Sequence, residues 1–143
     1  MATFRMTLDS SWALSDLFNY MATFSNAADW DPSTTSGEAL TGGDPRLHSE
    51  YRVSIAVGSR EIPLVYEIVE FDRLRRVVLS AEYKMLHSLA AIEVTPSPNG
   101  TLLTYEASIT GLGPFAAADP LIARALRRRG TKTEASLRAK IDA

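Results

Sequence analysis

The stretch YRVSIAVGSREIPLVYEI, residues 51–68, decides the fold class of this chain. Apolar and polar side chains alternate on both sides of Gly58-Ser59, which is the pattern of two half-buried strands. A two-residue loop that begins with glycine suits a type II′ turn, so we expect an antiparallel hairpin. The predicted inward face of this hairpin carries Tyr51 and Tyr66 among aliphatic side chains.

The same alternation recurs on either side of the hairpin. Further strands are predicted over residues 3–8, 33–41, 77–83, 86–94 and 103–109. A helix with apolar residues at helical spacing is predicted over 14–21, capped by Ser10 or Ser11, with a short second helix over 25–28. A long helix is predicted from Pro120 to about Ile141. This order predicts an α+β protein whose antiparallel sheet has one wet face.

Composition narrows the possible functions. The 143 residues favour one domain, residues 1–143, and the net charge of −2 gives no case for a nucleic-acid partner. The absence of cysteine excludes disulfides and cysteine-ligated metals, and the two histidines lack metal-site spacing, so we expect neither a metal nor a cofactor. No signal peptide or membrane-spanning segment is visible, so a cytoplasmic protein is expected, as a monomer or a homodimer.

Four of the five tyrosines share the inward face of successive predicted strands: Tyr51, Tyr66, Tyr83 and Tyr105. A buried hydroxyl without a partner costs about 1–3 kcal/mol, so each needs a neighbour, water or a ligand. Two interpretations stay open. The tyrosines are ordinary core residues whose hydroxyls reach the sheet edge, or they are the orienting groups of an apolar pocket. Trp30 lies at the mouth of that pocket or plugs the core.

The apolar stripe of the last helix contains two small residues at mid-length. Leu121, Ile122, Ala125 and Leu126 precede Gly130 and Thr133, and Leu137 and Ile141 follow. Small residues there leave volume between helix and sheet, or they mark a kink, because glycine costs about 1 kcal/mol inside a helix.

Charged residues are absent from the predicted inward faces of the strands. General acid–base catalysis needs a titratable group beside the substrate, so this absence favours binding over catalysis. Asp29 and Asp31 are the candidate exceptions, although solvated turn carboxylates are the expected interpretation. A basic cluster on the last helix is expected to be mostly solvated, with transient contact to anionic lipid headgroups as the alternative: Arg124, Arg127, Arg128, Arg129 and Lys132.

The local sequences and the element order together resemble one superfamily. The stretches on which this resemblance rests are FSN at 24–26, WDP at 30–32, RRVVL at 75–79, GTLLTY at 100–105 and DPL at 119–121. The whole chain resembles the START-like, or Bet v 1-like (SRPBCC), superfamily and within it the polyketide cyclase/dehydrase and lipid-transport branch. The resemblance implies a helix-grip fold, in which a seven-stranded antiparallel sheet wraps around the C-terminal helix and encloses a cavity. It carries no catalytic residue onto this chain.

These observations lead to three hypotheses. The first is a carrier or sensor that binds a small hydrophobic or amphipathic molecule, such as a lipid or polyketide, in an internal cavity. The second is a polyketide cyclase, dehydratase or aromatase, and the third is a protein-interaction or assembly module. For the first hypothesis the predicted ligand-binding residues are Trp30, Tyr51, Tyr66, Ile68, Leu79, Tyr83, Ile92, Tyr105, Ile109, Gly130 and Thr133.

Overall fold

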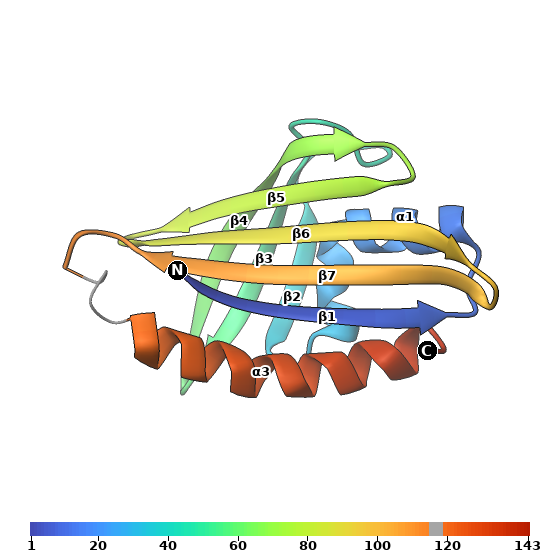
Figure 1. The fold of residues 1–143 in the computed structure, drawn as a ribbon. Helices are drawn as coiled ribbons and strands as arrows, with labels where there is room; N and C mark the ends of the chain where they lie inside the picture. Colours follow the sequence, from blue (N-terminus) through green and yellow to red (C-terminus); the bar gives the residue numbers. More distant parts are fainter. Residues whose placement is uncertain (115–118) are drawn as a thin grey trace.

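The computed structural model describes residues 1–114 and 119–143, which form a seven-stranded sheet with helices packed on it (Figure 1). In chain order the elements are β1 (Ala2–Ser10), α1 (Leu14–Ala22), the 3-10 turn η1 (Phe24–Asn26), α2 (Ala27–Trp30), β2 (Thr34–Ala39), β3 (Glu50–Val57), β4 (Arg60–Asp72), β5 (Arg76–Tyr83), β6 (Leu86–Ser97), β7 (Gly100–Gly111) and α3 (Asp119–Lys140). The predicted fold class and order of elements are confirmed.

The sheet is antiparallel throughout and has the strand order β1-β7-β6-β5-β4-β3-β2. β1 therefore joins the end of the meander by pairing with β7, and α3 runs along the sheet on its β1 side (Figure 1). The predicted hairpin forms at Gly58, whose φ of 62° is accessible to glycine at little cost. Tyr51 and Tyr66 are directly opposed in its register.

One end of the inward face is solidly packed. Leu17, Phe18 and Met21 of α1 are fully buried and join the core formed by the sheet. Phe18 meets Phe71 of β4 edge to face, with ring centroids 5.8 Å apart. Helix α1 therefore fills this end of the sheet, where it contacts β6 and β7.

Helix α3 faces the sheet with Leu126, Gly130, Thr133 and Leu137, all buried, and Ile141 directly after its end is buried as well. The predicted stripe is wrong at its start, because Leu121 is 73% exposed.

The gap predicted at Gly130 is largely filled from the sheet. A Cβ at Gly130 would lie 2.6 Å from ring atoms of Phe4 in β1. The glycine therefore makes room for an aromatic ring.

Neither serine caps α1, which corrects the sequence prediction. Ala13 occupies the N-cap without a side-chain hydrogen bond. Ser10 instead donates to the carbonyl of Ile141 at 2.5 Å, and Ser11 donates to the carboxylate of Asp142 at 2.5 Å. The two serines therefore join the end of β1 to the C-terminal end of the chain.

Candidate functional site

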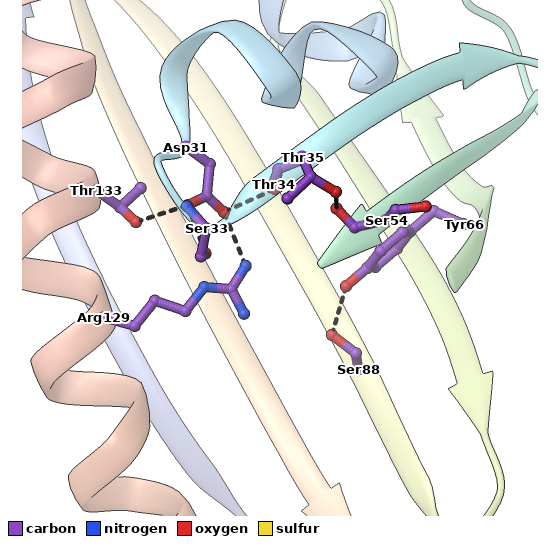
Figure 2. Close-up of polar contacts among 9 residues, drawn as sticks. All are labelled: Asp31, Ser33, Thr34, Thr35, Ser54, Tyr66, Ser88, Arg129 and Thr133. Carbon is purple, nitrogen blue, oxygen red and sulfur yellow. Dashed lines mark hydrogen bonds and ion pairs between the residues drawn. The ribbon is translucent and has the colours of Figure 1, made fainter. Parts of the chain in front are cut away.

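A buried carboxylate organises the space between α3 and the sheet. Asp31 follows α2 and is only 6% exposed. Its oxygens accept bonds from the amide and hydroxyl of Ser33 at 3.0 and 2.8 Å, and from the Thr34 hydroxyl at 3.1 Å. From α3, Arg129 Nη2 donates to it at 2.7 Å and the Thr133 hydroxyl at 3.1 Å (Figure 2). The expectation of a solvated turn carboxylate at Asp31 is therefore wrong.

Arg129 departs from the rest of the basic cluster. Arg124, Arg127, Arg128 and Lys132 are exposed, whereas the Arg129 side chain is 32% exposed and reaches inward to Asp31. One turn of helix separates Arg129 from Thr133, so both side chains reach the same carboxylate.

Electrostatics keep this pair ionised. Burial raises the pKa of the Asp31 carboxyl, but the charge and hydrogen bond of Arg129 and the bonds from Ser33 outweigh it, so the pKa lies below its usual value. Burial likewise lowers the pKa of Arg129, and Asp31 more than reverses this effect. The pair carries one negative and one positive charge, so its net charge at neutral pH is zero.

Two phenols lie near this ion pair. The Tyr66 and Ser88 hydroxyls hydrogen-bond each other at 2.8 Å across from the Arg129 guanidinium (Figure 2). The Tyr105 hydroxyl takes part in none of the hydrogen bonds found among the described residues, although only 9% of the residue is exposed. Burial is the largest effect on both phenols and raises the pKa of Tyr66 and of Tyr105.

Two adjoining cavities, each partly open to solvent, meet at this point. The first has a volume of about 40 Å³. Polar groups line one side of it, including Asp31, Tyr66, Tyr105 and Arg129, and apolar side chains such as Phe4, Met6 and Leu126 line the rest. The second has a volume of about 130 Å³ and mostly aliphatic walls, which come from Ile55, Val57, Ile62, Leu64, Ala81, Leu86 and Ile109. Tyr66, Ser88, Ile109 and Arg129 line both cavities and form the boundary between them.

A third hollow also borders the ion pair. It has a volume of about 470 Å³ and is lined by the pair itself, by Pro32 and Ser33, and by Arg128 and Lys132 of α3. The Asp31–Arg129 pair therefore lines both the first cavity and a basic hollow.

The structure divides the predicted ligand-binding residues into two groups. Those that line one of the two adjoining cavities are Tyr66, Tyr83, Tyr105, Ile109, Gly130 and Thr133. Those that line neither cavity are Trp30, Tyr51, Ile68, Leu79 and Ile92, all of them in the packed core, to which Tyr66 and Tyr105 also belong. The second group lies within the core that includes α1 and α2. Trp30, for example, is 1% exposed and packs edge to face on Phe24 and Tyr105.

The sequence did not predict that Asp31, Arg129 and Ser88 are neighbours at one cavity, although it offered Asp31 as a candidate titratable group. A signal was present for Arg129, which lies three residues after Leu126 and four before Thr133, on the edge of the inward stripe. Ser88 has the inward parity of β6 between Leu86 and Ala90. For Asp31 no local signal distinguished a buried carboxylate from an ordinary turn.

The described residues contain neither a metal-binding cluster nor a helix suited to cross a membrane. Residues 1–114 and 119–143 hold no group of three or more histidine, aspartate or glutamate side chains that could bind a metal ion. In the same ranges, no helix combines the length and the apolar character that crossing a membrane requires.

Comparison with solved structures shows the same fold in proteins of very different sequence. The Zhui aromatase/cyclase from Streptomyces sp. R1128 superposes with a TM-score of 0.72 at 12% identity, covering 98% of this chain and 93% of that chain. Protein CV1439 from Chromobacterium violaceum gives 0.71 at 14% identity, with 100% and 99% covered. Ara h 8.0201 gives 0.67 at 11% identity, with 97% and 96% covered.

Sequence comparison identifies the family. No curated protein matches the chain. The family profile described as polyketide cyclase / dehydrase and lipid transport matches residues 1–142, which is nearly the whole chain. With the curled seven-stranded sheet and the C-terminal helix packed on it, this match shows that the chain belongs to the polyketide cyclase / dehydrase and lipid transport family.

Proposed function

We propose that this protein binds a small amphipathic molecule whose apolar part occupies the aliphatic cavity and whose polar end lies beside Tyr105, Tyr66 and Arg129. The observation that carries this proposal is the meeting of two unlike cavities at shared residues, one almost wholly apolar and one with a polar side. Small-molecule sites are commonly built in this way, from apolar walls with a few orienting polar groups.

The Tyr105 hydroxyl gives the polar cavity its binding capacity. Tyr105 lines the smaller cavity, and its hydroxyl makes no hydrogen bond within the described part of the chain. A ligand oxygen in that cavity can accept its proton, and one such hydrogen bond contributes about 0.5–1.5 kcal/mol net. Tyr66 supplies a second hydroxyl, already oriented by Ser88.

Binding is better supported than catalysis. A general acid or base at neutral pH needs a pKa near 7. The polar groups of the cavities move away from that value: the pKa of Asp31 is lowered, and the pKa values of Tyr66, Tyr105 and Arg129 are raised. A cyclase that acts by orienting its substrate is the second candidate. The Zhui aromatase/cyclase, which has the same fold, supports keeping it.

Native mass spectrometry of the freshly purified protein tests the proposal without a chosen ligand, because a co-purifying mass identifies the ligand class. In parallel, the isoleucine methyl NMR signals are followed during titration with acetophenone. We expect saturable shifts at Ile109 and Ile55, which line the aliphatic cavity.

A cavity-filling variant provides the control. Ile109→Trp is expected to abolish the shifts at Ile55, whereas Val69→Trp, at an exposed position of β4 outside both cavities, leaves them unchanged. Saturable binding that survives Ile109→Trp places the ligand elsewhere and contradicts the proposal, as does the absence of any binding.

A further inference from the structure

We propose that the site selects uncharged ligands with a hydrogen-bond-accepting head, such as a carbonyl oxygen, and rejects carboxylates. This inference rests on the proposed function and names the chemical class of the ligand. It follows from the charge balance, the unused donors and the size of the two cavities.

The charge of Arg129 is already neutralised. Its Nη2 lies 2.7 Å from Asp31 Oδ2, and the carboxylate side chain is only 7% exposed. A ligand carboxylate beside Arg129 brings a second negative charge next to Asp31 with no second cation inside. An uncompensated charge in a poorly solvated site is strongly unfavourable.

The other cations near the pair do not compensate a second negative charge in the cavity. Arg128 and Lys132 are the other charged side chains that line a hollow beside the pair, and both are exposed to solvent. Charges in water are screened by the solvent and by salt, so they contribute little inside the cavity.

The cavity offers donors, while its strongest acceptor is fully used. Asp31 accepts five hydrogen bonds, from Ser33, Thr34, Arg129 and Thr133. A guanidinium has five N–H donors, and the described residues account for one of them at Arg129. With the free Tyr105 hydroxyl, the polar end therefore favours a ligand atom that accepts hydrogen bonds.

Cavity volume limits the body of the ligand. An engineered apolar cavity of about 150 Å³ binds benzene, and the aliphatic cavity here is close to that at about 130 Å³. The polar cavity of about 40 Å³ accommodates one small polar group. The two together fit a single six-membered ring, or an aliphatic group of that size, with a carbonyl attached.

Three probes of one shape test the selectivity. Acetophenone has the neutral acceptor, benzoate has the charge, and ethylbenzene has neither. Affinities are measured at pH 7 by NMR titration or calorimetry. We expect acetophenone to bind about tenfold more tightly than ethylbenzene, because one net hydrogen bond is worth roughly that factor. Benzoate is expected to bind at least tenfold more weakly than acetophenone.

Asp31→Asn then changes the selectivity. The substitution keeps the shape of the side chain and leaves Arg129 without a counter-charge, so benzoate should gain tenfold or more relative to acetophenone. Asp29→Asn, at an exposed position two residues away, is the matched control and should leave the ratio unchanged. A ratio that Asp31→Asn does not move overturns the inference.

The outcomes separate the two proposals. If none of the three probes binds the wild-type protein, the proposed function fails. If ethylbenzene and acetophenone bind but benzoate binds within threefold of acetophenone or more tightly, the cavity stands and the charge selection is wrong. Should Asp31→Asn not fold, this wild-type ratio decides the inference alone.

Discussion

Asp31→Ala provides the most direct test of the polar interior. The substitution leaves Arg129 without its counter-charge and removes the acceptor of the Ser33, Thr34 and Thr133 bonds. Removing one partner of a buried ion pair costs about 3–5 kcal/mol. Because the Arg129 side chain is 32% exposed and water can solvate it, we expect the lower end, about 3 kcal/mol.

Urea denaturation followed by circular dichroism at pH 7 measures this loss, with a fall in melting temperature of roughly 6–12 °C for a chain of this size. Asp29→Ala is the control, since Asp29 is exposed and its removal should cost less than about 0.5 kcal/mol. A double-mutant cycle with Arg129→Met isolates the coupling of the pair. A loss below about 0.5 kcal/mol for Asp31→Ala would refute the assignment of a buried, fully bonded carboxylate.

The pH dependence follows from the direction of the Asp31 shift. Its folded-state pKa lies below the usual value of 3.8, so its contribution to stability is fully present above about pH 5. That contribution is lost as the pH falls through the lowered pKa. The stability difference between wild type and Asp31→Ala should therefore be constant from pH 7 to about pH 5 and shrink in more acidic solution. A difference that grows on acidification contradicts this sign.

Three further predictions concern other parts of the molecule. Gly130→Ala should destabilise by about 1 kcal/mol in urea denaturation, because the overlap with the Phe4 ring outweighs the helix propensity gained, and Phe4→Leu in the same chain should recover most of it. Tyr20→Phe should be neutral or stabilise the protein by up to about 1 kcal/mol, because the Tyr20 hydroxyl is buried without a partner among the described residues. In the wild type, burial first and Asp29 second raise the pKa of Tyr20 to about 12, which a spectroscopic titration checks. If the exposed cations of α3 contact membranes during ligand exchange, the protein should co-sediment with anionic but not zwitterionic vesicles at low salt, and sedimentation that is insensitive to salt would count against this contact.

The local sequence pattern was sufficient to predict the strands, the hairpin and the long terminal helix. The alternation in residues 51–68 and the turn at Gly58 predicted a hairpin whose register the structure confirms, with Tyr51 opposite Tyr66. The long terminal helix was predicted from proline at its start and apolar spacing along it. These features depend on neighbours within a few residues, because side-chain parity and turn geometry are set by the local backbone.

Parity did not reveal which part of the inward face stays open. Tyr51 and Tyr66 share that face and both belong to the core, yet only Tyr66 of the two lines a cavity. The ring of Tyr66 also packs on Phe24 of η1, so parity alone does not separate a ring at a cavity wall from one inside the core.

The polar centre of the site was decided by tertiary structure alone. Asp31 and Arg129 are 98 residues apart in the chain; Asp31 has an ordinary turn context, and the place of Arg129 at the edge of the inward stripe does not identify its partner. Likewise, the ring that fills the space at Gly130 comes from Phe4 at the other end of the sequence. Sequence periodicity fixes the direction in which a side chain points, whereas the partner it meets depends on how the sheet curls and where α3 packs on it.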